Sequence, residues 1–226
     1  TNNELLRKFS EVAPGSFQHS MQVSNLASEA ALSIGANPML VRAGALYHDI
    51  GKMNNPAFFT ENQSSINPHT ELNDEEKSAQ IIIKHVTDGV AIAKKNGLPE
   101  KIQDFILTHH GNGKTKYFYY TLKNKYPDKV IDDSKFTYPG PRPFSKETAI
   151  LVMCDSVEAA SRSLQDYTDQ SINDLVENII NSQIQEGTFE DAPITLKQIS
   201  TIKSVLKEKL KTIYHTRIIY PELNNK

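Results

Sequence analysis

The residues that could do chemistry in this sequence are mainly histidines and aspartates. His48 and Asp49 stand side by side where an apolar helical stretch ends at Gly51. Successive helical residues point about 100° apart, so such a pair can serve two neighbouring metal ions better than it can chelate one. A carboxylate can also bridge two cations with its two oxygens, which an imidazole cannot. Taken alone, however, such a pair is more commonly a helix-end histidine beside a capping aspartate.

The same residue types recur at positions that the apolar pattern places inside the protein or at helix ends. They are His19, His85, His109, His110 and Asp155. A single histidine of this kind is usually a hydrogen-bonded core residue. Charged residues, in contrast, rarely occupy inward positions unless they pair or bind a metal. Five histidines and two aspartates together therefore favour a metal cluster.

The composition limits the classes of function. The 226 residues suffice for a sizeable core, and a net charge of −2 without a basic block argues against a surface for polymeric nucleic acid. Cys154 is the only cysteine, which excludes a disulfide framework and fits a reducing compartment. No apolar run approaches the roughly 18 residues that a membrane-spanning helix needs. We expect a soluble chain, and because it begins with Thr1 we expect a fragment of a longer protein.

Period-3.6 patterns dominate the chain, so we predict an all-α fold with a single domain over residues 1–226. The predicted helices cover 3–11, 16–34, 38–49, 74–96, 99–110, 114–126, 145–164, 171–185 and 195–217. Ser16 and Ser145 are expected N-caps, and Thr195 and Gln198 have the spacing of a capping box. Gly89 is expected to permit a break or kink. We expect a lid over 53–73 and a rigid, proline-rich loop over 127–143.

The order of the candidate ligands resembles that of the HD-domain metal-dependent phosphohydrolases, and the five-histidine form resembles the subset with two metal ions. Further motifs are similar to the cytoplasmic HD domain of the PgpH-type seven-transmembrane cyclic-di-AMP phosphodiesterases. These motifs are Ala13–Gly15, His48–Lys52, Glu61–Gln63, Asn67–His69, His109–Gly111, Tyr138–Pro141 and Asp155–Ala160. The resemblance covers nearly the whole chain. It implies an all-α HD-domain helical bundle that hydrolyses cyclic di-AMP to linear 5′-pApA.

The family pattern implies a dinuclear metal site. It assigns one metal to His19, His48, Asp49 and Asp155. It assigns the other to His85, His109 and His110, with Asp49 bridging the two. The resemblance therefore implies attack by a metal-bridging hydroxide, which two ions about 3.5–4 Å apart can supply. A mostly imidazole ligand set favours iron or manganese over magnesium.

The resemblance and the residue types also suggest substrate contacts. Lys52, one turn beyond Asp49, is expected to hold a non-bridging phosphate oxygen, as the family pattern implies. Tyr138 or Tyr117 is expected to stack on adenine, and Arg142 to reach the substrate from the same loop as Tyr138. His69, in the lid, is a further candidate for a substrate contact, beside the alternative of a surface or loop-packing histidine.

Four other residues are expected to have supporting or structural roles. Glu158 and Arg162 are predicted to form a pair that supports Asp155. His215 is expected to be structural, and Cys154 a core residue that precedes a ligand.

The sequence alone leaves other functions open. The HD-GYP relatives, which hydrolyse cyclic di-GMP, carry a Gly-Tyr-Pro element after their paired histidines, whereas this chain has Gly111–Tyr117 without it. Alarmone or dNTP hydrolysis is disfavoured because those sites commonly use a shorter ligand set. A catalytically silent nucleotide-sensing module would be expected to lack one or two ligands. The resemblance also implies membrane helices upstream, with this fragment at the cytoplasmic face of a bacterial cell membrane, and it allows an oligomer.

Overall fold

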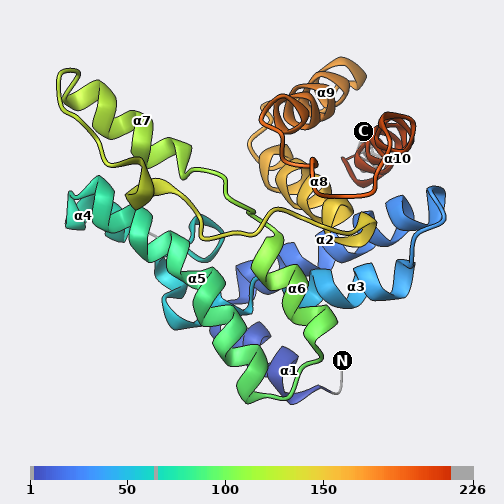
Figure 1. The fold of residues 1–226 in the computed structure, drawn as a ribbon, viewed down its shortest axis with the longest axis horizontal. Helices are drawn as coiled ribbons and strands as arrows, with labels where there is room; N and C mark the ends of the chain where they lie inside the picture. Colours follow the sequence, from blue (N-terminus) through green and yellow to red (C-terminus); the bar gives the residue numbers. More distant parts are fainter. Residues whose placement is uncertain (1–2, 64–65, 215–226) are drawn as a thin grey trace, which may run out of the picture.

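The computed structural model describes residues 3–63 and 66–214, and within these ranges the chain is helical and contains no strand (Figure 1). The α-helices are α1 (Glu4–Val12), α2 (Pro14–Ser33), α3 (Pro38–Tyr47), α4 (Pro68–Leu72), α5 (Glu75–Lys95), α6 (Glu100–Thr108), α7 (Lys116–Lys125), α8 (Lys146–Ser161), α9 (Asp169–Gln185) and α10 (Leu196–Tyr214). Four 3-10 turns accompany them: η1 (Ile50–Asn54), η2 (Pro56–Phe58), η3 (Thr60–Asn62) and η4 (Asp133–Phe136). The predicted all-α fold is confirmed. None of these helices is long and apolar enough to cross a membrane.

One predicted helix start is wrong. The second helix begins at Pro14 rather than at a Ser16 cap, because a proline in the first turn already has the helical φ and lacks an N–H that would need a partner. Ser16 is buried inside the first turn of α2, and its hydroxyl donates to Glu61 Oε1 at 2.7 Å. The residue thus fastens a distant segment to α2 instead of capping it.

Two other predicted caps are confirmed. Ser145 caps α8, and its side chain accepts a hydrogen bond from the backbone of Thr148. At the start of α10, Gln198 Oε1 accepts from Thr195 N at 3.0 Å, and Thr195 Oγ1 accepts from Gln198 N at 3.2 Å. The described part of α10 ends at Tyr214, so His215 lies outside the described residues.

The two segments predicted as loops contain local structure. Residues 53–73 include η2, η3 and α4, and Phe59 in this stretch is buried. The proline-rich loop at 127–143 includes η4, and its end is held to the rest of the chain because Tyr138 N donates to Gly113 O at 2.9 Å. Together with α7, η4 forms an arm at the upper left of Figure 1.

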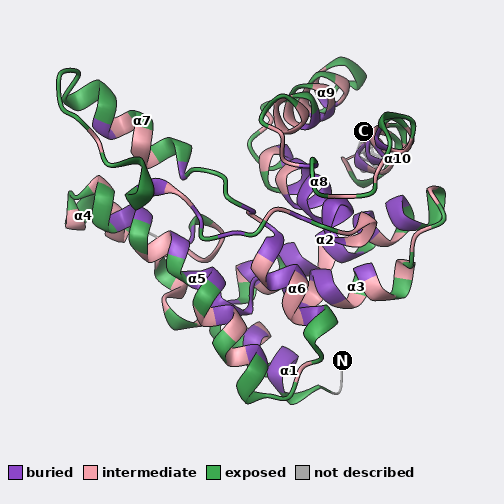
Figure 2. Ribbon diagram, viewed as in Figure 1, coloured by how far each residue is buried: buried purple, intermediate pink, exposed green. Residues whose placement is uncertain are grey.

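The buried side chains form two main clusters, which appear as purple ribbon on the inner faces of the helices in Figure 2. The larger cluster joins α2, α3, α8, α9 and α10, and it includes the predicted α2 stripe at Val23, Leu26, Ala27 and Ala30. The smaller one joins α1, α6, η1, the end of α5 and, through Tyr47, the end of α3. Because α3 contributes to both, its C-terminal end lies between them. That end carries His48 and Asp49.

Helix α5 runs unbroken through Gly89, so the expected break is absent, and a kink stays a prediction. The glycine has a packing role, because η1 crosses α5 in close contact there. A Cβ added at Gly51 would lie only 1.8 Å from the carbonyl oxygen of His85 and 2.6 Å from Gly89 N. A Cβ at Gly89 would lie 2.8 Å from Ile106 Cγ2. The turn after Asp49 therefore rests directly on the backbone of the helix that carries His85.

Candidate metal centre

Three of the predicted ligands take their orientation from their own helices. His48 and His109 directly follow the last residues of α3 and α6, and His85 lies within α5. In each ring, Nδ1–H donates to the carbonyl three residues earlier, at 2.7 Å for His48, 2.6 Å for His85 and 2.7 Å for His109. Because Nδ1 donates to a carbonyl, Nε2 is the ring nitrogen left to bind a metal, which is the arrangement that metal-binding histidines use.

Asp49 lies between these rings, and each of its oxygens faces a different pair of histidines. Oδ2 lies 3.3 Å from His48 Nε2 and 3.8 Å from His19 Nε2. Oδ1 lies 3.5 Å from His85 Nε2 and 3.6 Å from His109 Nε2. The residue is only 1% exposed; Oδ1 has no hydrogen-bond partner among the described residues, and Oδ2 forms an ion pair with Lys52 Nζ at 2.7 Å. The geometry places Asp49 where one carboxylate can bridge two cations.

The donor set fits metal ions. The Nε2 atoms of His85 and His109 lie 3.0 Å apart with their lone pairs turned toward one another, and a cation would relieve this contact. His48 Nε2 is likewise buried without a hydrogen-bond partner in the described part of the chain. Unsatisfied buried polar atoms are costly, so their concentration here indicates a binding site. Three groups have ligand atoms within 4.8 Å of one another: His85, His109, His110; His19, His48, Asp155; and His48, Asp49, His109.

His19 is held by two carboxylates. Its Nε2 lies 2.8 Å from Asp155 Oδ1, and its Nδ1 pairs with Glu158 Oε2. The other oxygen of Glu158 accepts from Arg162 Nε at 2.9 Å and Nη2 at 2.7 Å. The predicted pair of Glu158 and Arg162 is therefore present. Glu158 contacts the Nδ1 side of the His19 ring while Asp155 contacts the Nε2 side, so the pair supports His19 directly, and its support of Asp155 stays a prediction.

His110, which follows the end of α6, is the last member of the cluster, and its ring packs against aromatic neighbours. Its ring stacks on Tyr138, with centroids 4.2 Å apart and planes inclined by 24°. The centroid of its ring also lies 4.1 Å from that of His109 and 5.2 Å from that of His85. Tyr138 is buried, so its observed contact is with a candidate ligand. Adenine stacking by Tyr138 stays a prediction.

The two halves of the cluster differ in protonation. Burial and then the neighbouring His85 lower the pKa of His110 to about 3, and burial likewise holds the pKa of His109 well below its usual range. At His48, burial would lower the pKa, but the attraction of Asp49 and Asp155 outweighs it and raises the pKa to about 10. Burial would raise the pKa of Asp49, but His48 and Lys52 hold it well below its usual range.

A cavity of about 500 Å³ opens onto the cluster. It is lined by His19, Asp49, Lys52, Thr60, Glu61, His110, Asp155, Ser156, Ala159, Arg162 and Ser163. Lys52 Nζ lies 2.7 Å from Asp49 Oδ2 and donates to Glu61 Oε1 at 2.8 Å. Burial would lower the pKa of Lys52, but Asp49 and Glu61 outweigh it and raise the pKa, so the ammonium stays charged. The structure thus places the predicted Lys52 in the cavity beside the candidate bridging carboxylate.

The remaining predicted substrate residues fall in two places. His69 and the exposed Tyr117 line a neighbouring cavity of about 610 Å³ that shares Thr60 and Glu61 with the first. Arg142 is not among the residues that line either cavity, and its guanidinium pairs with Glu190. The structure therefore brings Tyr117 and His69 together but does not bring Arg142 to them.

Sequence reasoning missed Phe59 and gave no role to Glu61. The Phe59 ring packs on the His85 ring, with centroids 5.5 Å apart, and lies 4.9 Å below Lys52 Nζ. Glu61 joins Lys52 to Ser16 through one carboxylate oxygen. Both lie in a segment without helical periodicity, so no pattern indicated which of its residues turn inward. The occurrence of Glu61 in a family motif was the only available signal.

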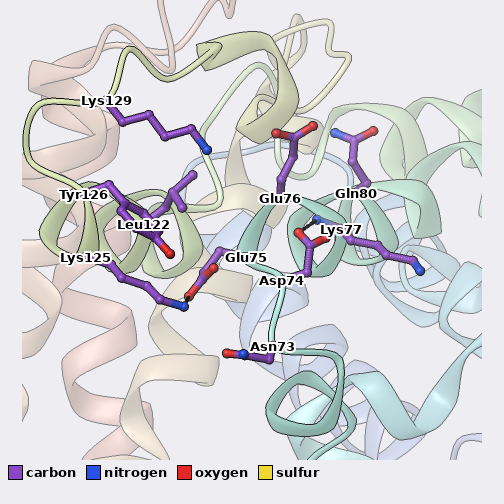
Figure 3. Close-up of a pocket in the computed structure, with 10 residues that line it drawn as sticks. All are labelled: Asn73, Asp74, Glu75, Glu76, Lys77, Gln80, Leu122, Lys125, Tyr126 and Lys129. Atoms are coloured by element: carbon purple, nitrogen blue, oxygen red, sulfur yellow. Dashed lines mark hydrogen bonds and ion pairs between the residues drawn. The ribbon is translucent and has the colours of Figure 1, made fainter.

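A separate cavity of about 550 Å³ lies between the start of α5 and the end of α7 (Figure 3). Its walls carry both signs of charge, with Asp74, Glu75 and Glu76 at the start of α5 and Lys125 and Lys129 at and after the end of α7. Lys125 Nζ lies 3.4 Å from Glu75 Oε1. None of the candidate ligands lines this cavity, so the chemistry is expected at the histidine cluster instead.

Comparison with known proteins agrees with this geometry. The family model for the HD domain matches residues 16–160. The chain is 43% identical over its full length to "Cyclic-di-AMP phosphodiesterase PgpH" of Bacillus subtilis (strain 168), and 44% identical over 98% of its length to the protein of the same name from Listeria monocytogenes serotype 1/2a (strain 10403S). It spans 31% and 30% of these two relatives, respectively.

The fold also matches a solved structure. The crystal structure of the L. monocytogenes phosphodiesterase PgpH HD domain in complex with cyclic-di-AMP superposes with a TM-score of 0.90 at 44% sequence identity. The match covers 96% of this chain and 100% of that one. The agreement therefore extends to the whole helical arrangement, beyond the region that the family model matches.

Proposed function

The chain belongs to the HD domain family, and from that premise we propose that it is a metal-dependent phosphodiesterase that hydrolyses cyclic di-AMP to linear 5′-pApA. The observation that carries the proposal is the likeness, over nearly the whole chain, to a domain crystallised with cyclic-di-AMP. The buried histidine and aspartate cluster supports the reaction class. All seven candidate ligands are present and gathered, which argues against a catalytically silent module.

We propose two divalent ions, with iron or manganese favoured by the many imidazoles. His19, His48 and Asp155 would hold one, His85, His109 and His110 the other, and Asp49 would contact both. When bound, such ions supply an activated water and neutralise charge that develops on a phosphodiester. The division of Asp49 between two pairs of histidines supports the proposed number of two ions.

Lys52 is proposed to hold a non-bridging phosphate oxygen. Its ammonium lies at the cavity wall, beside the carboxylate that joins the two halves of the cluster. Phe59 beneath it and Glu61 beside it keep the flexible lysine stem in this position. The charge is therefore fixed next to the reacting centre, where it needs no rearrangement during the reaction.

The neighbouring cavity is proposed to receive an adenine. It is lined by aromatic and apolar side chains, namely Phe58, Phe59, Ile82, Tyr117 and Phe118, together with His69. No lysine or arginine is among its described lining residues, whereas Glu61, Asp74 and Glu75 are, so it suits an uncharged base better than a phosphate. Because it adjoins the metal cavity at Thr60 and Glu61, a base could lie here while its phosphate lies at the cluster.

The test is a chromatographic time course with cyclic di-AMP and cyclic di-GMP in one tube, using protein purified anaerobically and supplied with iron(II) or manganese(II). Selective conversion of cyclic di-AMP to 5′-pApA is the expected result, and Asp49→Asn is the matched inactive control. Preferred loss of cyclic di-GMP would favour the HD-GYP-like alternative. If a protein loaded with two metals consumes neither compound, the substrate proposal is wrong.

We also propose that this domain belongs to a longer, membrane-anchored protein and acts at the cytoplasmic face of a bacterial cell membrane. That the chain spans about a third of the length of the curated relatives it matches supports the longer protein, and the membrane anchor rests on the resemblance of its motifs alone. A single domain over residues 1–226 and a possible oligomer stay predictions. Fractionation of cells that express the full-length protein would test the anchoring.

A further inference from the structure

Arg162 has a fixed orientation at the edge of the metal cavity. Its Nε and Nη2 both donate to Glu158 Oε1, so one edge of the guanidinium is bound. Glu158 is itself buried and tied to His19, which makes it a rigid support. The Arg162 side chain nevertheless remains 34% exposed, and Nη1 has no hydrogen-bond partner among the described residues. The second edge is therefore available to a ligand.

The position of Arg162 relates it to the cluster. Arg162 is the C-cap of α8 and follows Asp155 by seven residues, so the two backbone positions share a helix face with a rise of about 10 Å between them, while the bonds to Glu158 turn the guanidinium back toward Asp155. Both line the same cavity, together with the hydroxyl residues Ser156 and Ser163. A ligand that reaches from the metal cluster to Arg162 would therefore lie along the inner face of α8.

Arg162 is also the more available of two cations. Among the described lining residues of this cavity, only Lys52 and Arg162 are lysine or arginine. The side chain of Lys52 is 13% exposed and its ammonium is already engaged by Asp49 and Glu61. A guanidinium group with one edge free to donate hydrogen bonds is well suited to a phosphate, because its N–H groups match the spacing of the phosphate oxygens.

We propose that Arg162 binds the second phosphate of the substrate, the one that is not being cleaved, and that it thereby makes the site selective for compounds with two phosphates. This inference rests on the proposed function, because a cyclic dinucleotide carries two phosphodiesters. One would lie at the cluster beside Lys52, and the other would meet Arg162 further along α8. Mononucleotide diesters would lack this second contact and be poorer substrates.

The experiment compares two substrates in the metal-loaded enzyme. Cyclic di-AMP carries two phosphates, and bis(p-nitrophenyl) phosphate carries one. Arg162→Gln should lower kcat/KM for cyclic di-AMP by roughly 10- to 100-fold, mainly through KM, the range expected for loss of a charged hydrogen bond. It should change kcat/KM for bis(p-nitrophenyl) phosphate by less than about twofold. Arg42→Gln, at an exposed arginine that donates to Asn25, is the matched control and should change neither.

Arg162→Lys keeps the positive charge but loses the paired N–H donors of the guanidinium. It should lower kcat/KM for cyclic di-AMP selectively, by less than Arg162→Gln does. If the Gln variant does not fold, the Lys variant decides by the same comparison. An equal loss on both substrates, together with a lower metal content, would overturn the proposal, because Arg162 would then act through Glu158 and His19. No loss on either substrate would also overturn it. Wild-type protein that cleaves bis(p-nitrophenyl) phosphate but not cyclic di-AMP would instead show that the proposed function itself is wrong, and the inference would fall with it.

Discussion

Replacing Gly51 by alanine tests the contact that joins the two halves of the metal cluster. The added Cβ would lie 1.8 Å from the carbonyl oxygen of His85, whereas C···O contacts normally require about 3.3–3.6 Å. The obstacle is backbone, so no side chain can rotate out of the way. The turn after Asp49 and helix α5 must therefore separate by roughly 1.5 Å.

The cost follows from this displacement. Overpacking of a core by extra methyl or methylene groups costs about 1–3 kcal/mol, and a clash with backbone lies at the upper end. At about 3 kcal/mol, a domain of this size should melt roughly 6–12 °C lower. The separation also moves His85 away from Asp49 Oδ1, now 3.5 Å from its Nε2, so the half of the cluster with His109 and His110 should bind metal more weakly.

The assay is thermal unfolding followed by circular dichroism in the presence of a chelator, since bound metal would otherwise add stability of its own. Metal content of separately loaded protein is then measured by mass spectrometry. Gly35→Ala is the matched control, because Gly35 has φ +70° but nothing within 4 Å of an added Cβ. It carries only the strain of the left-handed backbone, about 1–2 kcal/mol, and should leave the metal content unchanged.

The reasoning is refuted if Gly51→Ala melts within about 2 °C of the wild type and binds the same amount of metal. Such a result would mean that η1 and α5 can separate at little cost. A stability loss no larger than that of Gly35→Ala would also contradict the reasoning, because the clash at Gly51 is expected to cost more than the backbone strain at Gly35.

Three further predictions concern the site. In the metal-free protein the pKa of His48 is raised to about 10, whereas that of His110 is lowered to about 3. At pH 7 an entering metal must therefore displace a proton from His48 but none from His110. Metal binding at pH 7 should therefore release protons, and the affinity for metal should rise as the pH rises toward 10. Calorimetry in buffers of different ionisation enthalpy would measure the number of protons released. A value of zero would contradict the protonation of His48 in the metal-free protein. Asp49→Asn should reduce metal loading in both halves, whereas His110→Ala should leave close to one ion per chain; equal loading of Asp49→Asn and wild type would show that Asp49 does not bridge. Tyr117→Ala should raise KM for cyclic di-AMP by roughly 5- to 150-fold, the range for loss of one stacked base. Tyr126→Ala, which removes another exposed tyrosine, is the control and should leave KM unchanged. Equal KM values in the two variants would show that Tyr117 is not part of the substrate site.

The ligands of the cluster could be anticipated from the sequence because their positions follow local rules. His19 lies on the apolar stripe of its helix, and His48 and His109 lie where helices end. Helical phase alone decides which way such residues point, so a period-3.6 pattern was sufficient. The assignment of each residue to a particular metal came instead from the family resemblance.

The surroundings of the cluster could not be anticipated in the same way because they depend on contacts between distant segments. Arg142 pairs with Glu190, and Glu61 bonds to Ser16, across separations of 48 and 45 residues. Gly89 was interpreted as a kink because a single sequence does not show that Gly51 would press against it. Side chains in aperiodic segments find their partners only when the helices have packed.

The hydrogen bonds from Nδ1 to a carbonyl three residues earlier have a consequence for how the centre tolerates change. Each of the imidazoles of His48, His85 and His109 is fixed within a single turn of its own helix, so ring and helix move together as one rigid body. The shape of the cluster then has few internal degrees of freedom, mainly the displacements and rotations of three helical segments. Substitutions in the surrounding core can alter the centre only by moving a segment, which leaves each individual ring orientation intact. Sequence changes in the core would therefore alter the spacing between the candidate ligands before they altered the direction of any one of them.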